Sequence, residues 1–238
     1  MSARSVGSGS RSSSSGSRSA SPRKLLSRAL ILDAAFAIVD ADDVNELTMS
    51  RLGRGLGADP SAVYRHFRNK DELLLAMADV LMDEVIASFE AVDEPIENLR
   101  RTIWAMRTAY LRRPALARAV SARFTGSPSE ARNVTIMIES MQRLGYDRDE
   151  AIARTRAIAE MSLGHIIMTA DVLALTLPQQ VFDLDLARHY YAAPIAPTEA
   201  LTRAELLAAA RADSDTVFHT MIETFLRGLA TDAPKKRR

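Results

Sequence analysis

The sequence predicts an all-α protein in which a small unit of three helices precedes a larger helical body. Apolar residues recur at helical spacing through most of the 238 residues, and no alternating strand pattern of useful length occurs. Proline and glycine separate these stretches into helix-length segments. Hydrophobic residues make up 47% of the chain but aromatic residues only 5%, so the expected core is mostly aliphatic.

The two ends of the chain differ in composition from its interior. Residues 1–22 contain mainly Ser, Gly and Arg, and we expect a disordered basic tail because they hold too little apolar surface to offset chain entropy. Residues 231–238 end in four basic residues and are expected to form a second basic tail, more solvated than bound. The formal net charge of +1 therefore conceals basic ends and a slightly acidic interior.

Composition also excludes several classes of protein. The chain has no cysteine, which excludes disulfides, thiolate catalysis and cysteine-bound zinc. No apolar run reaches the roughly 18 residues of a membrane span, and no apolar stretch follows the N-terminal arginines. We therefore expect a cytoplasmic protein without a membrane partner.

The first helical domain is expected over residues 23–70. The pattern turns helical from Leu25 to Val39, with its apolar residues on one face. Thr48 is a good N-cap for the next helix, and Gly57 supplies the left-handed residue at which that helix ends and the chain reverses.

Two further helix starts follow this turn. Asp59 can cap a helix whose first position is Pro60, where a missing N–H costs nothing. Asn69 caps the helix after it, and Glu72 completes a capping-box-like pair. Two short helices joined by a glycine turn, the second basic and aromatic, are typical of a helix-turn-helix unit that reads the major groove of DNA.

The larger domain is expected over residues 71–230. Its helices are predicted at 70–92, 96–113, 115–123, 128–144, 148–176 and 201–230. Residues 177–200 are interrupted by three prolines, yet they contain several apolar and aromatic side chains. They form either a short helix near 183–191 or a disordered segment.

Over residues 25–80 the chain resembles the TetR family of bacterial transcriptional regulators. The segment AVYRHFRNKDELL, residues 62–74, is similar to the recognition helix and following helix of that family, and farther along only the helical pattern is shared. The family places alanine or a polar residue where this chain has Gly53 and Gly55. Gly53 can permit closer helix packing, whereas Gly55 has no evident gain, so the helix after Thr48 is expected to fray without DNA.

Nine side chains are predicted to contact DNA. Arg65 is expected to grip guanine, with a phosphate contact as the alternative, and small Ala62 lets the helix approach and can touch a thymine methyl. Tyr64, His66 and Lys70 look like phosphate contacts, as the resemblance also implies, with packing, a helix-end cation and a solvated charge as their respective alternatives. Thr48, Ser50 and Arg51 lie at a helix start, where free N–H groups and small hydroxyls favour a phosphate. The nine are Thr48, Ser50, Arg51, Ser61, Ala62, Tyr64, Arg65, His66 and Lys70. Val63 and Phe67 are expected to pack inward, and the N-terminal tail either enters the minor groove or only adds general attraction.

For the body, the resemblance implies a small-molecule cavity and pairing of the last two helices with a second subunit. The expected pairing residues are Ile152, Ala159, Leu163, Ile167, Val217, Phe218, Met221, Ile222 and Phe225. The candidate ligand contacts are Trp104, Tyr110, Phe124, Met137, Met141, Met161, His165 and Met168, each with ordinary core packing as the alternative. Arg107, Arg112 and Arg113 are expected on the solvated surface, with contact to an acidic ligand as the alternative.

These patterns together predict a homodimeric repressor that a small-molecule effector releases from a palindromic DNA operator. The alternative is a helix-turn-helix regulator without small-molecule sensing, controlled by a protein partner or by abundance. No metal site, cofactor or enzymatic activity is expected, because no nucleophile, phosphate loop or ligand spacing with useful specificity occurs.

Overall fold

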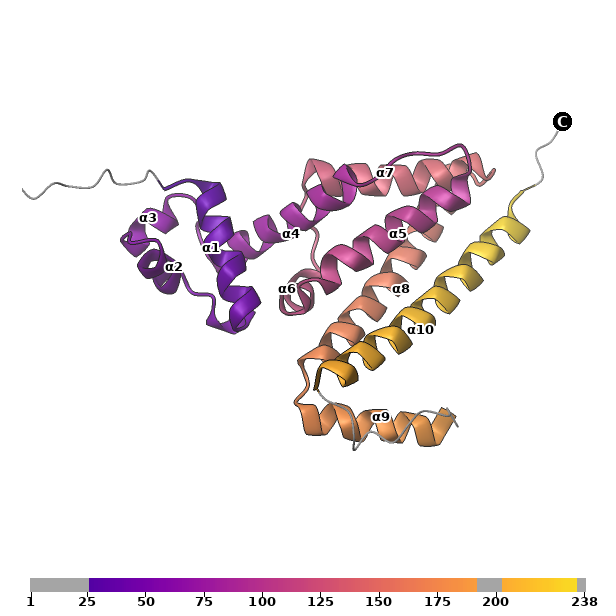
Figure 1. Cartoon of the computed structure of the whole chain (residues 1–238). Helices are drawn as coiled ribbons and strands as arrows, with labels where there is room; N and C mark the ends of the chain where they lie inside the picture. Colours follow the sequence, from indigo (N-terminus) through magenta and orange to yellow (C-terminus); the bar gives the residue numbers. More distant parts are fainter. Residues whose placement is uncertain (1–25, 192–202, 235–238) are drawn as a thin grey trace, which may run out of the picture.

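The computed structural model describes residues 26–191 and 203–234, and within these ranges the secondary structure is entirely helical (Figure 1). The elements are α1 (Arg28–Ala41), a 3-10 helix η1 (Val44–Glu46), α2 (Met49–Gly55), α3 (Pro60–Tyr64), α4 (Lys70–Ala87), α5 (Pro95–Leu111), α6 (Pro114–Val120), α7 (Pro128–Arg143), α8 (Arg148–Ala174), α9 (Leu177–Tyr191) and α10 (Arg203–Asp232). The all-α prediction is confirmed. The predicted tail over 1–22 and the end of the C-terminal tail, 235–238, lie outside the described residues.

The predicted caps fix the starts of the short helices. The Thr48 side chain accepts a hydrogen bond from the Arg51 backbone N–H at 3.1 Å, and Asp59 accepts one from Ser61 at 2.8 Å. Asn69 likewise accepts from the Glu72 N–H at 2.8 Å. The expected capping box also requires the Glu72 side chain to accept a hydrogen bond from the backbone N–H of Asn69, and this second bond is replaced by another.

The Glu72 carboxylate turns to the residue before the cap. It accepts from the backbone N–H of Arg68 at 2.9 Å and from the Nε of the same residue at 3.1 Å. The start of α4 is therefore fixed by Asn69 and by a Glu72–Arg68 pair, not by a reciprocal box.

The reversal between α2 and α3 depends on two glycines with different tasks. Gly57 has a φ of +62°, the left-handed conformation that a side chain would disfavour. Gly53 is needed for space, because a Cβ there would lie 2.9 Å from the carbonyl oxygen of Ala58 and 3.1 Å from the nitrogen of Pro60. The absence of side chains therefore brings α2 and α3 into close contact.

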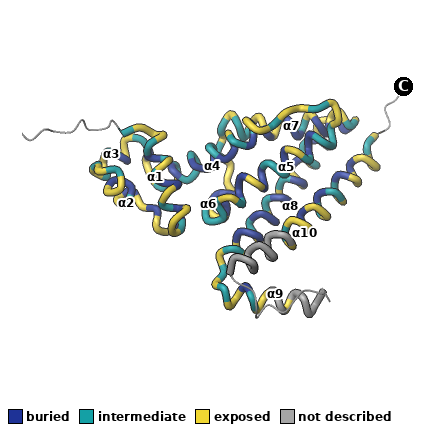
Figure 2. The backbone as a smooth tube through the Cα atoms, in the orientation of Figure 1, coloured by how far each residue is buried: buried dark blue, intermediate teal, exposed yellow. Residues whose placement is uncertain are grey.

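Helices α1, α2 and α3 share one core with the start of α4. The fully buried side chains Ile31, Leu47, Leu52, Val63 and Phe67 meet there. Figure 2 shows buried positions interspersed with exposed ones along these helices. The inward packing predicted for Val63 and Phe67 is confirmed.

The body is built around α8, which packs against α5, α6, α7 and α10. A second core lies between α5, α7, α8 and α10, and its fully buried members include Leu99, Ile103, Met141, Ile158 and Phe218. Helix α6 contacts α1 and η1 on one side and α8 on the other, while α4 contacts α5, α6 and α7. Helices α4 and α6 are therefore the links between the small unit and the body.

Helix α9 resolves part of the segment for which two readings were open. It begins at Leu177, six residues before the short helix expected near 183–191, and runs to Tyr191. Figure 1 shows it lying across the adjoining ends of α8 and α10. The disordered alternative is therefore wrong for residues 177–191, and the rest of the segment, 192–200, lies outside the described residues.

Helix α8 is long and apolar enough to cross a membrane by length and composition alone. This is weak evidence, since the central helix of a folded domain satisfies the same test. Here α8 packs against four helices of the body on one side, and its apolar residues include core positions and an outer face.

Candidate DNA-binding and effector sites

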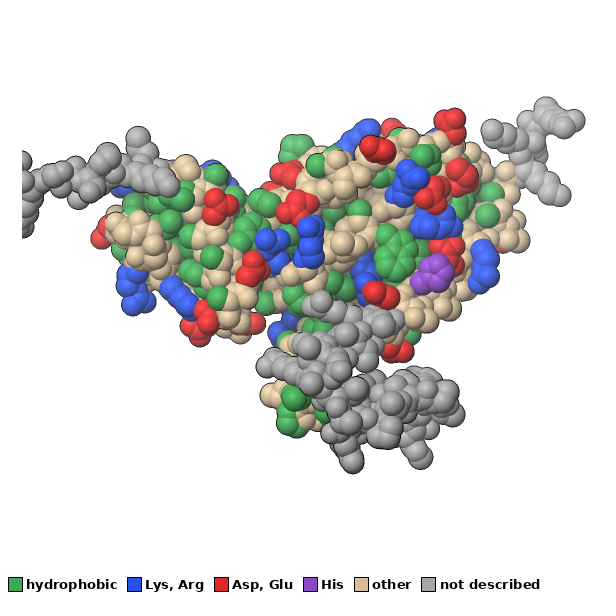
Figure 3. All heavy atoms as spheres, in the orientation of Figure 1, with side chains coloured by type: hydrophobic (Ala, Val, Ile, Leu, Met, Phe, Trp, Pro, Cys, Tyr) green, Lys and Arg blue, Asp and Glu red, His purple; other side chains and the backbone are tan. Residues whose placement is uncertain are grey.

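Helices α2 and α3 form the end of the molecule farthest from α10 (Figure 1). Ser61, Tyr64 and Arg65 are exposed there, as are Thr48 and Ser50 at the start of α2. Ala62 and His66 are partly buried. Figure 3 shows basic side chains along the edge of this unit, with acidic side chains among them.

Helix α3 is short, and the residues predicted to read DNA extend past its end. Its last helical residue is Tyr64, and Arg65 is the C-cap, whose N–H still bonds the Ser61 carbonyl at 3.3 Å. The Arg28 guanidinium donates to the His66 carbonyl at 2.6 Å and lies 4.1 Å from the Phe67 ring centroid. The N-terminus of α1 therefore supports the end of α3.

Two cations predicted to contact phosphate already have partners within the chain. Arg51 forms ion pairs with Asp42 and, at 3.1 Å, with Glu46. The Lys70 ammonium donates to the Val44 carbonyl at 2.5 Å, which leaves two of its N–H groups for a phosphate. Arg51 likewise has N–H groups left for a phosphate, but its charge is already shared with two carboxylates. The DNA contacts of all nine residues stay predictions.

The residues predicted to surround a ligand do not form one group. Phe124 is 85% exposed in the α6–α7 connection and Met168 is exposed on α8, so neither can line an interior cavity of one subunit. The prediction is wrong for both, because helical spacing indicates a face but not what covers it. Met137 and Met141 are buried in the second core, where Met161 packs at its edge.

Tyr110 belongs to a different group, between α4, α5 and α7. Burial, followed by the charges of Glu130 and Asp79, raises the pKa of its phenol to about 12. Tyr110 is therefore a neutral donor, separate from the remaining ligand candidates, Trp104 and His165.

Trp104 and His165 lie at a polar cluster between α5, α8 and α10. The Ser214 hydroxyl is its centre, with the Arg107 Nη2 at 2.9 Å, the His165 Nε2 at 3.1 Å and the Thr169 hydroxyl at 2.8 Å. The Arg107 Nη1 also lies 2.5 Å from an oxygen of Asp215. We call these five residues the Arg107 cluster.

Aromatic rings enclose the Arg107 cluster. The Phe218 centroid lies 5.1 Å from that of Trp104, edge to face, and 5.2 Å from that of His165. The Arg107 guanidinium carbon lies 4.9 Å from the Phe218 centroid and 5.7 Å from that of Trp104. One cation therefore stands among three rings.

Burial, followed by the positive charge of Arg107, lowers the pKa of His165 below its usual value. His165 is consequently neutral at physiological pH. The Arg107 cluster thus contains one positive charge, one carboxylate and several neutral hydrogen-bonding groups.

Sequence reasoning assigned Arg107 to the solvated surface, and that is wrong. Its side chain is only 7% exposed. The signal was available: Arg107 lies four residues after Ile103 and three before Tyr110, both on the buried stripe of α5. Arg112, paired with Glu84, is exposed as expected, and Arg113 is partly buried against Asp40.

The outer faces of α8 and α10 are apolar. Met161, Val217, Met221 and Phe225, together with three threonines, line an open groove of about 530 Å³ between them. Gly164 and Gly228 are both exposed on these faces, with no atom within 4 Å of an added Cβ. This face has the character of a helix-pairing surface.

The predicted pairing set divides between this face and the interior. Phe218 and Ile222 are fully buried inside the subunit, so they are not available to a second copy and the prediction is wrong for them. Val217 is exposed, and the remaining members are partly buried: Ile152, Ala159, Leu163, Ile167, Met221 and Phe225. Met168, predicted to contact ligand, is exposed on α8 with them.

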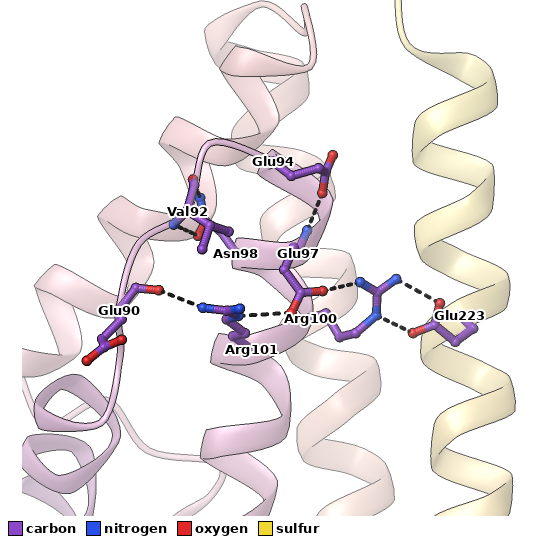
Figure 4. A network of polar contacts seen from close by, with 8 residues as sticks. All are labelled: Glu90, Val92, Glu94, Glu97, Asn98, Arg100, Arg101 and Glu223. Carbon is purple, nitrogen blue, oxygen red and sulfur yellow. Dashed lines mark hydrogen bonds and ion pairs between the residues drawn. The ribbon is translucent and has the colours of Figure 1, made fainter.

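A charged network holds α10 against α5 (Figure 4). The Nε and Nη2 of Arg100 bind the two oxygens of Glu223 at 2.6 and 3.0 Å, and Nη1 binds Glu97 at 2.5 Å. The hydrogen bond from Arg100 holds the pKa of the Glu223 carboxyl below its usual range. The hydrogen bonds from Arg101 and then Arg100 lower the pKa of Glu97 in the same way.

Two further arginines join the small unit to the body. Arg123, just after α6, binds both oxygens of Asp71 at 2.7 and 2.9 Å. Arg113, just before α6, lies 3.3 Å from Asp40 and 4.4 Å from the Phe36 ring centroid. Both ends of α6 are therefore tied to helices of the small unit. Within 26–191 and 203–234, no group of three or more potential ligands is placed to hold a metal ion.

Comparison with known proteins agrees with this geometry. Residues 31–77, which contain the predicted DNA-reading helices, match the family model described as bacterial regulatory proteins, tetR family. An HTH-type transcriptional regulator of Saccharopolyspora erythraea is 24% identical over 144 residues, 60% of this chain and 61% of that protein. An HTH-type transcriptional repressor of Mycobacterium tuberculosis is 30% identical over 104 residues, 43% and 40% of the two chains. The chain thus spans less than two thirds of these relatives.

Solved structures extend the likeness to the body. BioQ in complex with its natural double-stranded DNA operator has a TM-score of 0.56 and 29% identity, covering 68% of this chain and 94% of that one. ActR of Streptomyces coelicolor in complex with (S)-DNPA has a TM-score of 0.64 and 21% identity, covering 88% and 99%. The second comparison shows the fold alone.

Proposed function

We propose that this chain, whose residues 31–77 match the tetR family of bacterial regulatory proteins, is a DNA-binding transcriptional repressor that a small-molecule effector releases from its operator. The observation that carries the proposal is the outward presentation of Ser61, Tyr64 and Arg65 on a short helix held by a buried Val63 and Phe67. The family is one of regulators and not of enzymes, in agreement with the expectation from the sequence.

The operator is proposed to be a palindrome bound by a homodimer. One α3 covers too few base pairs for selective binding, and a two-fold pair of subunits doubles the readout. The apolar groove between α8 and α10, with Gly164 and Gly228 beside it, supports pairing through these two helices. A protein that binds chromosomal DNA acts in the bacterial cytoplasm, which is the location we propose.

The effector is proposed to act inside the body, since ActR is known in complex with (S)-DNPA and has the same fold. A ligand that prefers one spacing of the two α3 helices shifts the population toward it by no more than its difference in affinity for the two states. A regulator without a small-molecule effector is the second candidate, favoured by the complete burial of Met137 and Met141.

Titration of the purified chain onto the DNA upstream of its own gene tests the proposal. We expect tight binding at low ionic strength that weakens steeply as salt rises, because phosphate contacts release counterions. An unrelated duplex of equal length should bind more weakly. Equal affinity for both duplexes, or no binding at low salt, would overturn the proposal.

A further inference from the structure

We propose that the effector is an organic anion with a hydrophobic portion, and that the guanidinium of Arg107 binds its acidic group. The inference rests on the proposed function, because it names the chemical class of the effector. The Arg107 cluster carries it, and a second arginine of α5 provides an internal comparison.

Arg100 and Arg107 lie seven residues apart on α5 and both face α10. At Arg100, Nε and Nη2 form a fork that holds both oxygens of Glu223. At Arg107, Nη2 of the same fork donates to the Ser214 hydroxyl, and among the residues that the structure describes the buried Nε has no acceptor. The chain therefore closes one fork with a carboxylate and leaves the other incomplete.

An incomplete fork is costly at this position. The Arg107 side chain is 7% exposed, and a buried guanidinium is stable only when its charge and donors are matched. Its one carboxylate, Asp215, binds at Nη1, on the other side of the guanidinium, and is itself 55% exposed. A carboxylate from a ligand would complete the fork as Glu223 does for Arg100.

The neighbouring groups favour an anion and oppose a cation. His165 is neutral, and Thr169 and Ser214 supply hydroxyls that turn to donate or accept. These groups add no negative charge at the fork, and Asp215 is the carboxylate that meets Arg107. A cationic ligand would meet Arg107 first.

The hydrophobic portion of the ligand follows from the rings around the fork. Trp104 and Phe218 meet edge to face beside the guanidinium, and Trp104 is partly exposed. Figure 3 shows hydrophobic side chains surrounded by charged ones on the surface over α5 and α10. An acid with an aromatic or aliphatic tail fits this environment, whereas a small hydrophilic anion leaves the rings without a partner.

The experiment compares each acid with its uncharged amide. The probes are 4-phenylbutyrate with 4-phenylbutyramide, and octanoate with octanamide. Trp104 is the only tryptophan of the chain, so its fluorescence reports binding at this cluster. We expect each acid to bind at least tenfold more tightly than its amide, and we expect calorimetry to give the same order.

Arg107→Gln is expected to lower the affinity for the acids about 10- to 100-fold and to abolish their advantage over the amides. Arg107→Lys should restore only part of it, since an ammonium lacks the fork. Arg101→Gln, on the exposed side of α5, is the matched control. It should change neither the affinity for the acids nor their advantage over the amides. The comparison of acid and amide on the unaltered chain decides the question even if the Arg107 variants fail to fold.

Equal affinity of acid and amide, absence of binding by both acids, or an acid preference that survives in Arg107→Gln would overturn the inference. DNA binding without any probe is measured on the same preparation. A chain that binds upstream DNA but shows no acid preference keeps the proposed function and loses this inference. A chain that ignores its DNA loses the proposed function, and the acid preference is still decided.

Discussion

At the scale of single residues, Arg65 combines a backbone held by α3 with a side chain that is free to meet DNA. Its backbone is the C-cap of α3 and its side chain is exposed. Arg65→Ala should weaken operator binding by about 1–3 kcal/mol, the usual contribution of a bidentate contact to guanine, with a smaller loss on a scrambled duplex. Fluorescence anisotropy on both duplexes measures the difference.

The exposed Arg143 at the end of α7, far from α3, provides the control. Arg143→Ala should leave both affinities unchanged. An equal loss on both duplexes for Arg65→Ala would instead assign Arg65 to phosphate, the alternative that the sequence left open.

His165 gives the stability of the protein a pH dependence of defined sign. Burial and the charge of Arg107 lower its pKa in the folded state, whereas the unfolded chain keeps a value of about 6.5. As pH falls through 6.5, the unfolded state takes up the proton first, so the free energy of unfolding decreases. Above that pH the residue contributes no pH dependence.

The prediction is that urea unfolding midpoints fall between pH 7 and pH 5 and that His165→Gln flattens this part of the curve. The carboxyls of Glu97 and Glu223, whose pKa values are also lowered, act in the same direction, because the free energy of unfolding again falls as pH falls. Their stabilisation is lost only below the unfolded value of about 4.3, outside this window. A midpoint that rises with acid, or an unchanged slope in the variant, would contradict the assignment.

At the scale of elements, the two glycines of α2 have different roles: Gly53 is required for close packing against α3, whereas Gly55 only makes the helix more flexible. Gly53→Ala should destabilise the protein, because the new Cβ meets the backbone of Ala58 and Pro60. Gly55→Ala should stabilise it by up to about 1 kcal/mol, since no atom lies within 4 Å and alanine is the better helix former. Urea unfolding of both variants measures the opposite signs.

Amide exchange extends the test to the expected fraying of α2. Exchange over residues 49–56 should be faster than in α8 and should slow in Gly55→Ala. Exchange in the unaltered chain as slow as in α8 would refute the fraying.

The starts of the helices were predictable because capping signals are local in the sequence. Which face of each helix is buried was not predictable, because that depends on the helices packed against it. Thr48, Asp59 and Asn69 cap as expected. Pro178 was interpreted as an interruption, yet it lies in the first turn of α9, where proline costs nothing. Phe218 and Val217 are neighbours in the sequence of α10, and the packing of α5 and α8 against this helix buries the first and leaves the second exposed.

The Arg107 cluster escaped prediction for a related reason. Arg107, Thr169 and Ser214 come from three helices and share no motif, so only tertiary contacts bring them together. The sequence identified Trp104 and His165 as candidates, but it did not show that Arg107 lies between them.

At the scale of the whole molecule, α4 and α6 carry any influence of the body on the reading helices. Arg123 ties α6 to Asp71, the residue that follows Lys70, and Arg113 ties it to Asp40 of α1. The exposed pair of Arg123 and Asp71 contributes little to the free energy of unfolding, because solvent screens its charges. Their position makes a displacement of α6 a displacement of the helices that hold α3.

Operator binding should depend on pairing through the outer face of α8 and α10. Val217 is 48% exposed in the groove between them. A glutamate at this position should be tolerated in the folded single subunit, but it should prevent two subunits from pairing. Val217→Glu is therefore expected to produce a folded monomer and to lower operator affinity by at least 100-fold, because one half-site replaces two. Light scattering after size exclusion and operator titration measure the two effects.

The chain offers a matched control for this substitution. Val134 on α7 is 37% exposed and lies away from the groove, so Val134→Glu introduces the same side chain at similar exposure. It should leave both mass and affinity unchanged. A Val217→Glu protein that keeps the mass of a dimer would place the pairing surface elsewhere. A monomer that binds the operator at full strength would contradict the two-fold readout, since the outer face of α8 and α10 would then have no part in recognising DNA.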